Sequence, residues 1–134
     1  MVTIADNSFD IDSVYLLDRA SSIFNELKLK GDITIKFGDK NESQSLNSQY
    51  RKKDIPTDVL SFPINEDFHD SFYIGDIHIC FPIAIDQAAS NGVHLNEELF
   101  TLICHGILHL AGYDHETDSG EMLVLQDKIV RKFI

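Results

Sequence analysis

The sequence has no lysine or arginine over a long stretch, from Asp54 through Asp127. The whole chain of 134 residues carries 11 Lys and Arg against 22 Asp and Glu, a formal net charge of −11. Cationic contacts to phosphate supply most of the affinity of non-specific nucleic-acid binders, so this composition excludes a broadly basic binding protein. If the protein binds RNA or DNA, the N-terminal part must supply the cations, and the basic cluster there is Arg51, Lys52 and Lys53.

Cysteines and long apolar runs are also scarce. The two cysteines, Cys80 and Cys104, do not make a disulfide framework, and we expect two small buried side chains in a protein of the reducing cytoplasm. No apolar run reaches the ~18 residues of a membrane helix, and the acidic start lacks the basic region of a signal peptide. The length suits a single domain, residues 1–134, whose core is large enough to be stable without cross-links.

Apolar periodicity and turn residues predict helices interleaved with strands. We expect strands at 32–38, 59–63 and 72–80, a polar loop at 65–70, and helices at 11–29, 43–51, 82–92, 95–112 and 118–134. Gly75 inside the last strand indicates a bulge or a close backbone approach. Candidate residues near the helix starts are Asp10 or Asp12, Ser43 or Ser45, Asn96, and Asp118 with Glu121. The pattern predicts an α+β fold, with a small mixed β-sheet of three or four strands packed with about five helices.

Three histidines, His105, His109 and His115, lie within the eleven residues 105–115. The first two are four residues apart, so they share one face of a central apolar helix. Gly112 can end that helix in a left-handed conformation and let the chain turn back, which brings the third histidine close. Three neutral imidazoles with a fourth position left for water form the catalytic arrangement of zinc. The spacing therefore predicts one open Zn²⁺ site, with other divalent metals also possible.

The motif lacks the glutamate that metzincin metalloproteases place directly after the first histidine of H-x-x-x-H-x-x-G-x-x-H. Gly106 stands at that position. A bound metal suits hydrolysis because it activates water and polarises a substrate oxygen, yet no general base is evident. Asp114, beside His115, either orients a ligand or acts on the water, or it is simply a turn residue. Cys104 would point about 100° away from His105 around the helix, so we do not expect it to be a fourth ligand.

The segment HGILHLAGYDH, 105–115, resembles the signature of the YbeY family, metal-dependent bacterial endoribonucleases of rRNA maturation and quality control. The block LNSQYRKKDIPTDVLSFP, 46–63, is similar to that family's N-x-x-Y-R-x-x-D-x-P-T-D-V-L-S-F-P segment. GDIHIC, 75–80, resembles its G-D-I strand. The resemblance implies a zinc-dependent, single-strand-specific endoribonuclease of the cytoplasm, which acts on rRNA precursors and has the ribosome or ribosomal proteins as partners.

The same resemblance implies that His105, His109 and His115 are the zinc ligands and that Arg51 is the functional arginine, which together make the catalytic residues. A guanidinium can grip a phosphate with two hydrogen bonds and neutralise charge that develops in an in-line displacement. Metal and arginine together would then stabilise the negative charge of the reaction, without a carboxylate base beside the first histidine. This is our hypothesis for the missing glutamate.

Several alternatives stay open. The protein could be a metallohydrolase of another substrate such as peptide, or a non-catalytic zinc-containing ribosome-assembly binder, which a fourth protein ligand would favour. Asp54 and Asp58 are signature positions of the resemblance, and Asp58 could equally fix the turn after Pro56. Asp76 is a candidate to brace a ligand histidine from behind. The remaining histidines, His69, His78 and His94, are expected in loops or at the surface.

Overall fold

The computed structural model describes residues 1–5 and 7–134. It contains, in chain order, β1 (Val2–Ile4), α1 (Ser13–Glu26), β2 (Asp32–Gly38), α2 (Lys40–Arg51), β3 (Val59–Phe68), β4 (Ser71–Cys80), α3 (Phe81–Asn91), α4 (Leu95–Leu110) and α5 (Glu121–Phe133). The strands form one mixed sheet in the order β1-β2-β4-β3, with β3 antiparallel to β4 and the other pairs parallel. The predicted α+β class, strand number and helix number are confirmed. Among the described residues, no helix has the length and apolar composition that crossing a membrane requires.

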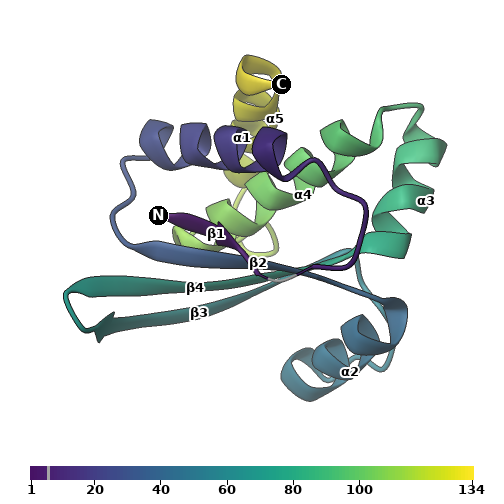
Figure 1. Cartoon of the computed structure of the whole chain (residues 1–134), viewed down its shortest axis with the longest axis horizontal. Helices are drawn as coiled ribbons and strands as arrows, with labels where there is room; N and C mark the ends of the chain where they lie inside the picture. The colour runs from purple at the N-terminus through teal and green to yellow at the C-terminus, as the bar shows by residue number, and fades with distance from the viewer. Residues whose placement is uncertain (6) are drawn as a thin grey trace.

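The two faces of the sheet have different neighbours (Figure 1). Alternate residues of β2, such as Ile33 and Ile35, point to the side that carries α1 and α4, and they join the buried core there. Their neighbours Thr34 and Lys36 point to the other side, because successive side chains of a strand alternate. On that second side lies α2, drawn below the sheet in Figure 1. The centre of the core is α4, whose Phe100 and most of whose apolar side chains are buried.

Two strand segments depart from the prediction. The prediction had no strand at the start of the chain, yet β1 pairs in parallel with the first half of β2. The polar loop predicted at 65–70 is wrong, because β3 continues to Phe68, which pairs with Ser71 of β4 across a tight hairpin. Gly75 shows both the bulge and the close backbone approach that the sequence indicates. The register of β2 against β4 shifts just before it, and a Cβ there would collide with the backbone oxygen of Phe62 on β3.

The helix starts agree with the prediction only in part. Asp12 caps α1 as expected, by accepting a hydrogen bond from the backbone N–H of Tyr15. The cap of α2 is Asp39, so the helix begins before the serines that were expected near its start. The cap of α4 is the His94 side chain rather than Asn96. These corrections lengthen α2 at its N-terminus and leave its C-terminal end, at Arg51, where the sequence placed it.

The expectation for the three remaining histidines is wrong for His78. Its side chain, on β4, is only 4% exposed, and its Nε2 lies 3.0 Å from a carboxylate oxygen of Glu42 on α2. Gly38 leaves room for this ring, since a Cβ at that position would meet it. His69, in the hairpin turn, and His94 are exposed as predicted. The second face of the sheet is therefore partly covered, and α2 is the element that covers it.

Candidate metal centre

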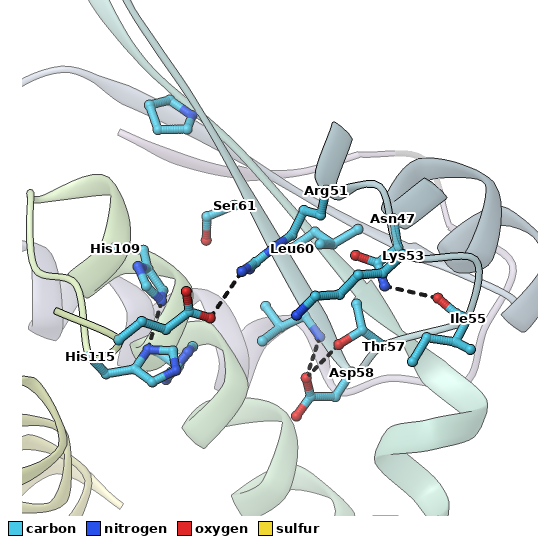
Figure 2. A pocket seen from close by; sticks show the side chains of 14 residues that line it. Asn47, Arg51, Lys53, Ile55, Thr57, Asp58, Leu60, Ser61, His109 and His115 are labelled. Carbon is cyan, nitrogen blue, oxygen red and sulfur yellow. Dashed lines mark hydrogen bonds and ion pairs between the residues drawn. The ribbon is translucent and has the colours of Figure 1, made fainter. Parts of the chain in front are cut away.

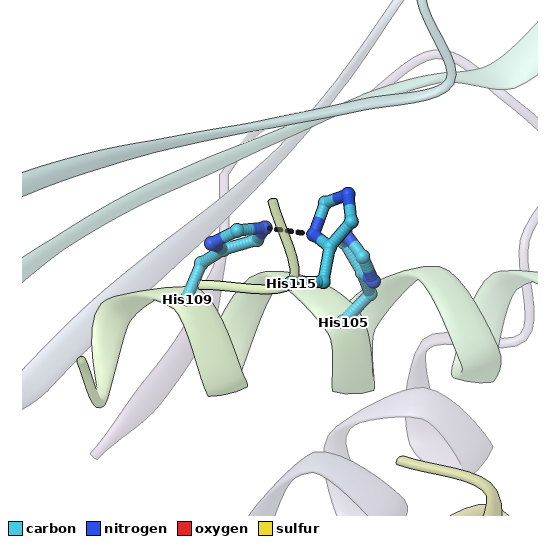
Figure 3. A group of neighbouring side chains, drawn as sticks. All are labelled: His105, His109 and His115. Carbon is cyan, nitrogen blue, oxygen red and sulfur yellow. Dashed lines mark hydrogen bonds between the residues drawn. The ribbon is translucent and has the colours of Figure 1, made fainter. Parts of the chain in front are cut away.

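The three motif histidines come together as the spacing predicts (Figure 3). His105 and His109 project from one face of α4, which ends at Leu110. Gly112, with a φ of 103°, turns the chain so that His115 returns over the helix. His109 Nε2 lies 3.2 Å from His115 Nδ1, and one ligand atom from each of the three residues lies within 4.8 Å of the others. This cluster could hold a metal ion.

A glutamine from the C-terminal helix fixes the first of these rings. Gln126 Oε1, on α5, lies 2.7 Å from His105 Nδ1. An amide oxygen can only accept, so Nδ1 carries the proton and Nε2 keeps its lone pair free for a metal. The sequence analysis considered Asp76 for this role of orienting a ligand histidine, and that prediction is wrong. The Asp76 carboxylate accepts a hydrogen bond from the hydroxyl of Tyr73 instead.

The surroundings of His109 favour a neutral imidazole. All three histidines are half-buried. Burial, followed by the neighbouring His105 and His115, lowers the pKa of His109. A ring with a lowered pKa stays neutral at physiological pH, and a neutral ring is the form that binds a metal.

Gly106 explains why the position after the first histidine carries no glutamate. This residue is buried and faces β4, not the cleft. A Cβ there would lie 2.9 Å from two side-chain atoms of Ile77. A longer side chain at this position would force α4 away from the sheet, so a carboxylate base cannot be supplied from here without repacking the core.

The histidine cluster lies on one side of a cleft of about 440 Å³ (Figure 2). The opposite side is formed by the end of α2 and the segment after it, which contribute Asn47, Arg51 and Lys53. Between them runs β3, with Leu60 and Ser61. Ser61 Oγ donates a hydrogen bond to the carbonyl oxygen of Gly106, which connects this strand to the helix that carries His105 and His109. The cleft therefore joins two segments that are about fifty residues apart in the chain.

Arg51 points across the cleft toward the histidines (Figure 2). Its Nη2 lies 3.0 Å from Glu116 Oε1, directly after the third histidine. Both side chains are well exposed, at 43% and 55%. Such a pair is weak and easily exchanged for another anion. Lys53 lines the same cleft, whereas Lys52 is the left-handed residue that ends α2 and does not line it.

Buried polar side chains of α2 hold the segment that follows it. Ser43 Oγ donates to the carbonyl oxygen of Thr57 and accepts from its N–H, at 2.8 and 2.9 Å. Asn47 Nδ2 donates to the carbonyl oxygen of Ile55 at 2.9 Å. Because both side chains are almost fully buried, these bonds have no water to replace them. They fix the course of the chain from α2 into β3 and so the place of Lys53 in the cleft.

The motif aspartates have local roles in the structure. Asp58 Oδ1 accepts from the N–H of Val59 at 2.8 Å, which is the turn-fixing role considered for it. Asp54 accepts from the Gln44 side chain at 3.1 Å. Asp114 Oδ1 accepts from the N–H of Glu116 at 3.0 Å, as a turn residue does. None of these bonds reaches a motif histidine.

Comparison with known proteins identifies the family of this chain. A family model described as Endoribonuclease YbeY matches residues 3–134. A protein of that name from Sulfurihydrogenibium sp. is 43% identical over 130 residues, which cover 93% of this chain and 86% of that protein. Its counterpart from Nautilia profundicola is 39% identical over 127 residues, covering 95% and 88%.

A solved structure has a similar fold. The solution structure of a Thermotoga maritima protein superposes with a TM-score of 0.67 at 30% sequence identity, and the match covers 99% of this chain and 89% of that one. The family match extends from β1 through α5, so it includes the three histidines of α4 and the turn after it as well as the arginine of α2. This chain therefore belongs to the Endoribonuclease YbeY family.

Proposed function

We propose that this protein is a zinc-dependent, single-strand-specific endoribonuclease of rRNA maturation and ribosome quality control. In this proposal His105, His109 and His115 hold the metal, and Arg51 acts on the phosphate. The observation that carries the proposal is one cleft into which three imidazoles and a guanidinium face from opposite sides. Relatives named as endoribonucleases support the class of reaction.

The donor set fits zinc. Two nitrogen ligands at 2.0–2.1 Å from a tetrahedral ion are about 3.3 Å apart, and the His109 and His115 nitrogens are 3.2 Å apart. The farthest ligand atoms of the cluster are within 4.8 Å, so modest rotations of the rings would complete the geometry. Bound zinc would lower the pKa of a water molecule and polarise a phosphate oxygen.

The residues of the chain have the following tasks in this proposal. Gln126 keeps the proton of His105 on Nδ1, away from the metal side. Arg51 exchanges its exposed partner Glu116 for a phosphate, which fits the guanidinium fork in the same way as a carboxylate. Its charge then stabilises the negative charge that develops on the phosphate oxygens during displacement. Lys53, farther along the same wall, contributes a phosphate contact.

The distribution of charge supports a single strand as the substrate. The cations that line the cleft are Arg51 and Lys53, and the sequence has none from Asp54 through Asp127. Binding of a duplex depends on many phosphate contacts, whereas a single strand can gain affinity from stacking of its bases. With a net charge of −11, we expect productive binding to need the ribosome or a ribosomal protein. The rRNA substrate would place the protein in the cytoplasm.

Specific observations argue against the two alternatives. A non-catalytic zinc site is closed by four protein ligands, whereas the described residues bring three together. A peptide hydrolase of the metzincin type needs a carboxylate after the first histidine, and Gly106 faces Ile77 at that place. A closed four-ligand zinc site and a metzincin-type peptidase therefore each require a group that the described residues do not place beside the three histidines.

The test is metal content, measured together with cleavage of a defined single-stranded RNA. His109→Ala should lose both, because two remaining ligands compete poorly with water, while the domain stays folded. Arg51→Ala should keep the metal and lose most of the cleavage. Arg131→Ala is a matched control, since this arginine pairs with Asp127 on the exposed surface of α5. Full cleavage by His109→Ala, or equal cleavage of the same RNA annealed to its complement, would contradict the proposal.

A further inference from the structure

A second groove opens on the α2 side of the sheet and continues from the metal cleft. It has a volume of about 710 Å³ and lies between α2 and the exposed face of β3 and β4. It shares Arg51, Leu60, Ser61 and Pro63 with the metal cleft, so the two spaces meet at the arginine. Tyr50, the tyrosine of the Y-R pair in the second sequence block, lines this groove and takes no part in the metal centre.

The groove contains a pair of aromatic rings. Tyr50 from α2 contacts Phe62 from β3 edge to face, with ring centroids 4.9 Å apart and planes at 65°. Tyr50 is nevertheless 59% exposed, which is unusual for a large ring that has an aromatic neighbour to pack on. Exposed aromatic side chains beside a cationic groove are surfaces on which unpaired bases stack. With 59% of its surface exposed, Tyr50 is accessible to a planar ligand in the groove.

The charges of the groove suit a phosphodiester strand. Arg51 lies at the end shared with the metal cleft, and Lys36 of β2 also lines the groove. Lys36 is exposed and takes part in no ion pair among residues 1–5 and 7–134. The acidic residues of the groove are engaged with protein partners, Glu42 with His78 and Asp76 with Tyr73. The groove thus carries two cations and two carboxylates, and both carboxylates are held by protein partners while Lys36 is held by none of the described ion pairs.

Helix geometry places one side chain in each of the two spaces, close enough for a single nucleotide to contact both. Tyr50 and Arg51 are consecutive residues of α2, and consecutive helical side chains point about 100° apart. One side chain therefore lines the groove while the next reaches into the metal cleft. A phosphate on the arginine has its own base, or the base of its neighbour, within reach of the tyrosine.

We propose that the Tyr50–Phe62 groove is a nucleobase subsite, in which an unpaired base next to the phosphate on Arg51 stacks against Tyr50. The subsite deepens the proposed endoribonuclease function, on which it rests, by stating how a single strand is recognised. Stacking reads the presence of an unpaired base and hardly its identity, because every base has a π face. A base held in a duplex cannot enter, so the groove selects single strands without selecting a sequence.

The first experiment is single-turnover cleavage of a single-stranded RNA at increasing protein concentration. Tyr50→Ala should raise the half-saturating concentration about 5- to 150-fold, the range that corresponds to the loss of one base–aromatic stack. Tyr50→Phe, which keeps the ring, should remain close to wild type. Phe68→Ala is the matched control, because Phe68 is also an exposed aromatic, at 65%, but lies at the hairpin end of β3 outside the groove.

The second experiment moves one abasic nucleotide through the RNA. At one position near the cleavage site the missing base should weaken binding to the wild type, and it should cost nothing further in Tyr50→Ala. Equal penalties in both proteins at every position would overturn the subsite. If Arg51→Ala loses cleavage but Tyr50→Ala behaves as wild type, the groove serves another partner, such as a protein, and the endoribonuclease proposal stands.

Binding can also be measured without cleavage. An RNA carrying the fluorescent base 2-aminopurine should change its emission on binding when that base lies at the subsite position, and this change should be absent in Tyr50→Ala. If the metal-loaded wild type bound this RNA with a Tyr50-dependent signal but cleaved none, the subsite would survive and the proposed activity would fail. No signal at any position would overturn the subsite.

Discussion

Replacement of Arg51 separates chemistry from binding more cleanly than any other change in the cleft. The side chain is 43% exposed and its Nη2 lies 3.0 Å from a carboxylate oxygen of Glu116, which is itself 55% exposed. Loss of an ion pair between two exposed side chains costs about 0.2–1 kcal/mol. Arg51→Ala should therefore leave the fold intact, and the metal should stay bound because arginine is no ligand.

The expected effect lies in the rate. At saturating RNA, Arg51→Ala should cleave about 10²-fold more slowly or worse, comparable to the loss of one oxyanion donor. Arg51→Lys should recover only part of this, because a point charge does not reproduce the two-pronged fork. Lys53→Ala should weaken binding and reduce its salt dependence by about one phosphate contact, with the saturated rate unchanged. Lys52→Ala is the control, since Lys52 is the adjacent cation and does not line the cleft.

The assay is single-turnover cleavage at several salt concentrations, with bound metal measured for each variant. Equal losses in Arg51→Ala and Lys53→Ala that both shrink with salt would show that the arginine only binds. Unchanged cleavage by Arg51→Ala would refute its assignment and strengthen the alternative of a zinc-containing binder. Loss of metal from Arg51→Ala would show instead that the two walls of the cleft are coupled in a way that the ion pair with Glu116 does not explain.

Three further predictions follow from single contacts. Gln126→Ala should weaken metal binding about 10- to 100-fold, as measured by competition with a chelator, because the proton of His105 is no longer held on the far nitrogen. Burial lowers the pKa of His78 below 6.5, so near and below that pH the unfolded chain binds more protons than the native protein does. The native protein therefore loses stability as the pH falls through 6.5. Urea unfolding at pH 7.5 and 5.5 should show a smaller loss of unfolding free energy in His78→Gln than in the wild type. Gly106→Ala should destabilise by about 1–3 kcal/mol through overpacking against Ile77, offset by about 1 kcal/mol of helix propensity, and a gain in the unfolding free energy would contradict this packing.

The sequence could predict the metal cluster because its geometry is local. His105 and His109 are one helical turn apart, and Gly112 fixes the return of the chain, so eleven residues contain all the information. Gln126 could not be found in this way. It lies on a different helix, and its side chain reaches His105 only because α5 packs beside α4. A glutamine on an amphipathic helix has the same local pattern whether it faces solvent or a ligand ring.

Two strand segments also depend on contacts that the local sequence does not record. β1 has three residues and is defined by its pairing with β2, which no local pattern records. The hairpin end of β3 is polar and exposed on both faces, so it has no apolar alternation to distinguish it from a loop. His78 alternates with the buried Ile77 and Ile79, which correctly places it on the opposite face of the sheet. The sequence does not show that this face is covered, because the position of α2 over it depends on tertiary packing.

The scarcity of cations also bears on substrate choice. A chain with 22 acidic residues repels most of an RNA molecule, and its cations at the cleft and groove come from one short part of the chain, Lys36 to Lys53. RNA gains affinity only where a strand brings a phosphate to this region, and repulsion elsewhere removes the non-specific background. In the proposed function phosphate binding belongs to α2, so the helix that carries His105 and His109 can be apolar and tightly packed, with glycine against the sheet. In the proposed function, metal and phosphate roles are divided between two elements, and this division would let an acidic protein with no glutamate after the first histidine be selective for RNA.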